Sequence, residues 1–98
     1  MKEFEKIIND PRPVLVDFYA TWCGPCRVMT PILEDLKKRV GNKAIIIKID
    51  IDQSEELVLK YAVQSVPTLM IFKNGEMIWR ESGIKQAHIL EQILEKYY

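Results

Sequence analysis

The two cysteines of this 98-residue chain, Cys23 and Cys26, are separated only by Gly24 and Pro25. They follow an apolar run and open a segment with helical periodicity, which places Cys23 at a helix N-terminus. Free N–H groups and the helix dipole at such an end stabilise a thiolate and lower the pKa of the thiol. Cys26, one turn further on, should face the interior and keep its proton longer. An exposed acidic thiol beside a sheltered one suits two-step thiol–disulfide exchange.

Two other uses of the cysteine pair are weaker. A structural disulfide that closes a ring of about four residues stabilises a fold by only about 2 kcal/mol, and a reducing compartment would work against it. A zinc site needs two further ligands, whereas the only histidine, His88, falls in the last predicted helix. A site shared between subunits is the remaining route to a metal. We therefore expect redox chemistry and no metal.

Two charged residues interrupt apolar runs near the pair. Asp17 lies within an apolar run, where burial is costly and raises the pKa of a carboxyl group. It could act as a general base on Cys26, directly or through a water, or be paired for structural reasons alone. Lys48 interrupts a row of isoleucines. It would lie beside Asp17 if the two strands are neighbours, or else discourage an edge strand from pairing with other chains.

The elements that position these residues follow from hydrophobic periodicity and turn residues. The predicted strands are 13–20, 44–51, 67–73 and 76–82, the last two joined by a type I′ turn at Asn74-Gly75. The predicted helices are 4–8, 24–40, 52–62 and 85–98. We expect Asp52 to cap the third helix, with Glu55 completing a capping box. A right-handed crossover makes the first two strands parallel, so the sheet is mixed, with helices on both faces.

Composition limits the function classes. Apolar residues make up 48% and charged residues 29%, as in an ordinary globular protein, and we expect one domain over 1–98. Fourteen basic and fourteen acidic side chains cancel, so neither nucleic acid nor a membrane surface is a favoured partner. The start shows no apolar run of signal-peptide length, and no run could cross a bilayer. We expect a cytoplasmic protein, with secretion by an unrecognised route as the alternative.

Several motifs occur together in an order that resembles the thioredoxin family. They are "VDFYATWCGPC", Pro31, "VPT" at 66–68, "FKNGE" at 72–76 and Gly83. The resemblance spans nearly the whole chain and implies an α/β thioredoxin fold, a four-stranded mixed sheet flanked by helices. The family usually has a further N-terminal strand, for which this chain has no room. The strand 44–51 would then be an exposed edge, a route to dimers in a protein otherwise expected to be a monomer.

The resemblance also implies roles for the site residues. Cys23 attacks a target disulfide, Cys26 resolves the mixed disulfide, and Asp17 takes the proton of Cys26. Pro67 is cis beside the cysteines and leaves the preceding backbone free to bind an extended substrate, although sequence alone also allows a trans proline that opens a strand. The implied docking surface consists of Trp22, Gly24, Pro25, Val66, Pro67, Gly83 and Ile84. Trp22 could instead be an ordinary core residue.

The implied activity is reduction of disulfides in target proteins, with no bound cofactor. An NADPH-dependent thioredoxin reductase would regenerate the dithiol. An oxidant or isomerase of the same fold is the nearest alternative, but Gly-Pro between the cysteines resembles the reductants. A binding module without turnover is the alternative from another class. Ser82 stands at a position that is usually apolar in the family, so we expect a more polar docking rim and a different target preference.

Overall fold

The computed structural model describes residues 2–98, and a single sheet of strand order β2-β1-β3-β4 forms its centre. The strands are β1 (Val14–Tyr19), β2 (Ile45–Asp50), β3 (Thr68–Lys73) and β4 (Glu76–Ser82). β1 runs parallel to β2 and antiparallel to β3, and β3 pairs antiparallel with β4. The predicted mixed sheet is therefore confirmed.

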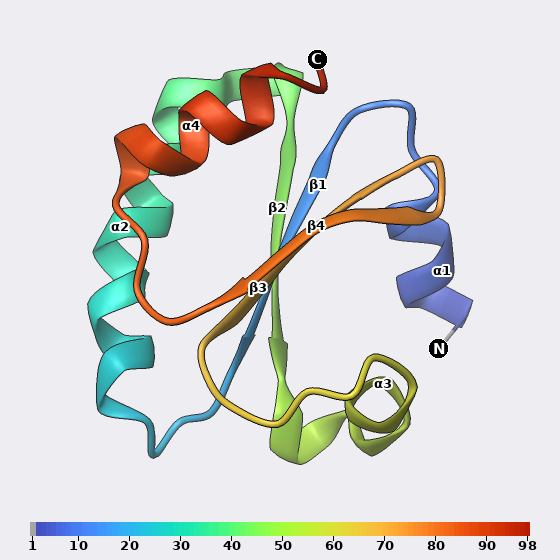
Figure 1. Cartoon of the computed structure of the whole chain (residues 1–98), viewed down its shortest axis with the longest axis vertical. Helices are drawn as coiled ribbons and strands as arrows, with labels where there is room; N and C mark the ends of the chain where they lie inside the picture. The colour runs from blue at the N-terminus through green and yellow to red at the C-terminus, as the bar shows by residue number, and fades with distance from the viewer. Residues whose placement is uncertain (1) are drawn as a thin grey trace.

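Helices cover both faces of the sheet. They are α1 (Lys2–Ile8), α2 (Gly24–Val40), α3 (Glu55–Lys60) and α4 (Ala87–Glu95), with short 3₁₀ turns η1 (Gly41–Lys43) and η2 (Ile51–Gln53). Figure 1 shows α2 and α4 on one face of the sheet and α1 and α3 on the other. No helix within residues 2–98 is long and apolar enough to cross a membrane.

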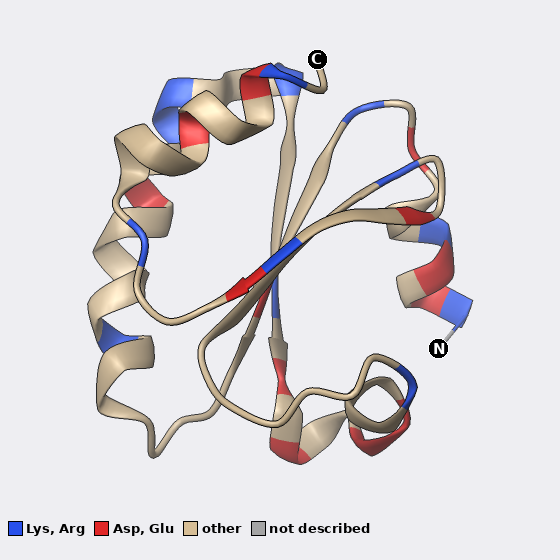
Figure 2. Cartoon of the chain, viewed as in Figure 1, with Lys and Arg blue, Asp and Glu red and all other residues tan. Residues whose placement is uncertain are grey.

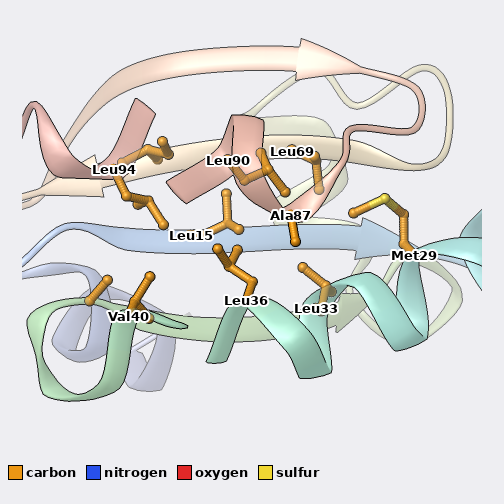
Figure 3. Close-up of a cluster of buried hydrophobic side chains, with 11 residues drawn as sticks. Leu15, Met29, Leu33, Leu36, Val40, Leu69, Ala87, Leu90 and Leu94 are labelled. Carbon is orange, nitrogen blue, oxygen red and sulfur yellow. The ribbon is translucent and has the colours of Figure 1, made fainter. Parts of the chain in front are cut away.

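Alternation along β1 divides the core between these two faces, because successive side chains of a strand point in opposite directions. Leu15 packs with Leu36 of α2 and Leu90 of α4 in the cluster drawn in Figure 3. Val16 and Phe18 belong to a second cluster on the opposite face, together with Phe4. β1 is thus buried on both sides, and a polar residue within it has no access to water along the strand.

Turn residues end the elements where the sequence predicts. Asn74 and Gly75 have φ of 52° and 83° between β3 and β4, the left-handed conformation that a type I′ hairpin turn requires. Gly41 has φ 55° and ends α2. The helix α2 continues through Pro31. These turns set the lengths of β3 and α2, which carry residues of the site.

The predicted cap of the third helix is wrong. Asp52 lies in η2, and α3 begins at Glu55 with Ser54 at the N-cap position. The side chain of Asp50 accepts the backbone N–H of Asp52 over 2.9 Å, which stabilises the 3₁₀ turn in place of an earlier helix start. The carboxylate of Asp52 is therefore free to bind elsewhere.

β2 is an edge strand of the sheet formed by residues 2–98. It pairs with β1 on one side and, within the described part of the chain, with no strand on the other. The expectation of an exposed edge at 44–51 is confirmed for these residues. Lys48, near the middle of this edge strand, is exposed.

Candidate functional site

The cysteine pair lies where the loop after β1 enters α2. Cys23 occupies the N-cap position with extended backbone (φ −89°, ψ 117°), and Pro25 lies in the first turn of the helix. Cys23 and Cys26 form a disulfide, with 5.3 Å between their Cα atoms. The backbone N–H of Cys26 donates to Cys23 Sγ over 3.1 Å. A sulfur at this position receives a free helix N–H, which favours a thiolate once the disulfide is reduced.

The expected contrast in exposure between the two cysteines is not found in the disulfide form. Cys23 is 5% exposed and Cys26 is 3% exposed. Both pack with Ala20, and Tyr19 and Val66 contact the same cluster. The disulfide holds Cys23 against these neighbours, so the two residues differ in helix position and not in overall exposure.

A loop from a distant part of the sequence approaches Cys23. The peptide bond between Val66 and Pro67 is cis, as the resemblance implies, so the alternative of a trans proline is wrong. The carbonyl oxygen of Val66 lies 3.7 Å from Cys23 Sγ. The carbonyl oxygen of Pro67 accepts the N–H of Gly83 over 2.9 Å. The loop before β3 is thereby placed between the disulfide and the end of β4.

Trp22 is 65% exposed and is therefore not a core residue. Its Nε1–H donates to Asp52 Oδ2 over 2.9 Å, a contact that sequence patterns do not predict because Asp52 has the residue type and spacing of a helix cap. Trp22 and Val66 line a hollow of about 310 Å³ together with Ile51. The indole is thus held beside the loop that carries Val66.

The other predicted docking residues surround the same end of the sheet. Gly24 and Pro25 are exposed, Ile84 is 39% exposed, and Gly83 is half-buried. Figure 2 shows no charged residue in the loop from the end of β1 to the start of α2. This loop therefore carries no charge of its own, and the carboxylate of Asp52 next to it is bonded to Trp22.

Asp17 is the only charged residue buried in the described part of the chain, with 0% of its surface exposed. Neither of its carboxylate oxygens has a hydrogen-bond partner in the described structure. Loss of hydration on burial raises the pKa of Asp17 to about 6, and the positive charge of Lys48 opposes this rise. A carboxyl group with this pKa can exchange a proton near neutral pH.

Lys48 has the position that each of its two predicted roles requires. It lies on the edge strand β2, and its Cα is the register partner of Asp17 on β1. Its Nζ lies 4.5 Å from the centre of the Tyr19 ring. A hollow of about 200 Å³ is lined by both Cys26 and Lys48. This hollow adjoins both the first turn of α2 and the edge strand β2.

A metal site has no support in the geometry. Within residues 2–98, no group of three or more His, Cys, Asp or Glu side chains is arranged to hold a metal ion. His88, the only histidine, is exposed on α4. The described residues thus contain one cluster suited to covalent chemistry, namely the disulfide with its surrounding loops.

Comparison with known proteins gives a consistent result. The thioredoxin family model matches residues 1–96. A thioredoxin of Bacillus subtilis is 43% identical over 84 residues, which cover 86% of this chain and 81% of that protein. A thioredoxin-like protein of Synechocystis is 44% identical over 93 residues, which cover 95% of this chain and 89% of that protein.

Solved structures agree with these relatives. A thioredoxin of Halobacterium salinarum superposes with a TM-score of 0.89 at 36% identity, over 99% of this chain and 84% of that one. A thioredoxin of Plasmodium falciparum superposes with a TM-score of 0.87 at 37% identity, over 100% of this chain and 94% of that one. The predicted fold is confirmed.

Proposed function

This chain belongs to the thioredoxin family of thiol–disulfide oxidoreductases, and we propose that it reduces disulfides in other proteins. The Cys23 thiolate attacks one sulfur of a target disulfide, and the other target sulfur leaves as a thiolate. The Cys26 thiolate then attacks Cys23 Sγ and releases the second target sulfur. Two electrons pass to the target, and the Cys23–Cys26 disulfide remains.

The observation that carries the proposal is the position of Cys23 Sγ. It accepts a helix N–H from Cys26 over 3.1 Å and lies 3.7 Å from the carbonyl oxygen of Val66. The first contact supports a nucleophilic thiolate. The second supports a target backbone that lies along the Val66 segment while its disulfide meets Cys23. Trp22, Gly24, Pro25, Pro67, Gly83 and Ile84 complete the proposed docking surface.

Asp17 acts as the base for the resolving step in this proposal. Cys26 must lose its proton before it attacks Cys23. Asp17 is buried, unpaired and has a pKa of about 6, so it can accept this proton near neutral pH. Lys48 supports the step by stabilising the ionised carboxylate of Asp17, the form that can accept the proton.

The proposed partners are disulfide-containing proteins and an NADPH-dependent thioredoxin reductase. One structural neighbour, at 30% identity and a TM-score of 0.87, comes from work on thiol resolution in a yeast mitochondrial 1-Cys peroxiredoxin via glutathione/thioredoxin systems. That description supports a protein disulfide as the substrate class. We also propose one thioredoxin domain over 1–98, no bound cofactor and a monomeric state.

The proposed location is the cytoplasm. The names of relatives include mitochondrial and chloroplastic thioredoxins, so cell fractionation with an antibody against this chain is the appropriate test. Recovery with organelles would contradict the cytoplasmic location and leave the chemistry unaffected.

The activity is tested by coupling the purified protein to NADPH and a thioredoxin reductase, with insulin as the disulfide substrate. Oxidation of NADPH should depend on this protein and stop in the Cys23→Ser variant. A pure binding module needs no thiol chemistry. If the wild type shows no turnover, and a variant with both cysteines replaced by serine still retains its partners in a pull-down, the binding-module alternative would be supported.

A further inference from the structure

Three hydroxyl groups and one carbonyl group form a chain of hydrogen bonds that starts and ends on Ser65, so that the backbone of this residue closes a ring. Thr68 Oγ1 donates to the carbonyl oxygen of Ser65 over 2.6 Å. A hydroxyl group has one proton, so Thr68 can only accept from Ser82 Oγ, which lies 3.2 Å away. Ser82 has then used its own proton and accepts from Ser65 Oγ, also over 3.2 Å. The ring runs from Ser65 through Ser82 and Thr68 back to Ser65.

The ring attaches the loop before β3 to the end of β4. Ser65 directly precedes Val66 in this loop, and Ser82 is the last residue of β4. On the other side of Val66, the N–H of Gly83 donates to the carbonyl oxygen of Pro67 over 2.9 Å. Val66 is therefore held between two attachments to the same strand end, with its carbonyl oxygen 3.7 Å from Cys23 Sγ.

Burial alone does not require this arrangement. Thr68 is fully buried, but its hydroxyl is already satisfied by the carbonyl group of Ser65. Ser65 and Ser82 are exposed, so water could satisfy their hydroxyl groups equally well. Their direct hydrogen bond therefore attaches the loop to the end of β4 although neither hydroxyl group needs a protein partner. Hydrogen bonds that follow one another in a chain polarise one another, which strengthens them.

We propose that Ser65 and Ser82 are positioning residues that fix the Val66 backbone for a protein substrate. This inference rests on the proposed reduction of protein disulfides. A fixed loop presents its backbone groups without first losing conformational freedom, whereas a loose loop must be ordered when the target binds. Neither hydroxyl group contacts a sulfur atom in the described structure. Removing either hydroxyl group should therefore slow the reduction of an extended protein substrate. It should not slow the reduction of a small disulfide, which needs no backbone edge on which to dock.

The test compares two disulfides under single-turnover conditions. The pre-reduced protein is mixed with excess insulin or with 2-hydroxyethyl disulfide, and formation of the Cys23–Cys26 disulfide is followed. Loss of the ring in Ser82→Ala should lower the second-order rate constant for insulin about fivefold, as expected for one net hydrogen bond. The rate constant for the small disulfide should stay within about twofold, because the sulfur chemistry is intact. Ser65→Ala should behave in the same way.

Two further variants complete the design. Ser82→Thr keeps the hydroxyl group and should restore the insulin rate. Ser54→Ala is the matched control. It also removes a serine hydroxyl group, but this serine is half-buried and makes no side-chain hydrogen bond to the helix that it precedes. Unchanged insulin rates in Ser82→Ala and Ser65→Ala, or equal losses with both disulfides, would overturn the positioning role. Failure of the wild type to reduce insulin would instead overturn the proposed function on which it rests.

Discussion

Asp17 on β1 and Lys48 on β2 are register partners in the parallel pair of strands, yet no hydrogen bond joins them. Both oxygens of the buried carboxylate lack a partner, while Lys48 is exposed and lies over the Tyr19 ring at 4.5 Å. The lysine therefore acts on the carboxylate through its charge alone. This leaves the pKa of Asp17 raised to about 6 by burial, in spite of the neighbouring cation.

The first prediction concerns stability and pH. In the unfolded chain the pKa of Asp17 returns to its ordinary value of 3.8, so the folded state binds this proton more tightly. The contribution of this proton to the free energy of unfolding is therefore fully present below about pH 4, and it is lost as pH rises through 6. Above that range the charged carboxylate costs about 3 kcal/mol.

Asp17→Asn removes this charge and should be more stable than the wild type by about 1–3 kcal/mol at pH 8, with the difference vanishing near pH 4. Urea unfolding at both pH values measures it. Glu76→Gln removes a carboxylate that is exposed on β4 and serves as the matched control. Equal stability of Asp17→Asn and wild type at pH 8 would show that the buried carboxylate carries no such cost.

The second prediction concerns the resolving step. Without a base at Asp17, Cys26 loses its proton more slowly, so Asp17→Asn should slow resolution at least about tenfold at pH 7. The mixed disulfide through Cys23 should accumulate, and the defect should shrink as pH approaches the pKa of a free thiol. Rapid mixing with acid quench and mass spectrometry measures the intermediate. A pH profile that coincides with that of the wild type would exclude Asp17 as the base.

The third prediction isolates the role of Lys48. Replacing it by methionine keeps most of the side-chain length and removes the charge that lowers the pKa of Asp17. The pKa of Asp17 should rise further in Lys48→Met, which an NMR titration of its carboxyl carbon measures. Lys38→Met, on the exposed side of α2, should leave it unchanged. An equal or lower pKa in Lys48→Met would mean that the lysine does not act on this carboxylate.

The fourth prediction assigns the order of attack. Cys26→Ser keeps Cys23 at the helix N-terminus and removes the resolving thiol, so target proteins should remain bound as mixed disulfides. Affinity capture followed by release with a reductant measures them. The reciprocal Cys23→Ser variant should trap none. Adducts through Cys26 in that variant, with none in Cys26→Ser, would reverse the assignment.

Local patterns were sufficient to predict much of this fold. The four strands, the Asn74-Gly75 turn and the parallel pairing of β1 with β2 follow from periodicity, turn chemistry and the handedness of crossovers. The burial of Asp17 was predictable too. All the other residues of the run 13–20 are apolar, so this strand has no side that faces solvent. Motif resemblance added the cis peptide bond before Pro67, which the residues alone left open.

Contacts between distant segments could not be predicted in this way. Asp52 has the residue type and spacing of a helix cap, but it binds Trp22, thirty positions away in the sequence. The bonds among Ser65, Thr68 and Ser82 depend on the close approach of a loop and the end of β4. The exposure of Cys23 was also wrong, because the disulfide packs it against the Val66 segment. Each of these features is fixed by tertiary packing.

The central claim is that the Cys23–Cys26 pair is a reductant of protein disulfides, and its equilibrium reduction potential tests this most directly. The protein is equilibrated with a series of dithiothreitol buffers, and the fraction of disulfide is measured after alkylation. Gly24 and Pro25 between the cysteines resemble the reductants, so we expect a potential of about −270 mV, as in thioredoxins. A value of about −180 mV or higher, typical of isomerases and oxidants, would contradict the proposed direction of electron transfer.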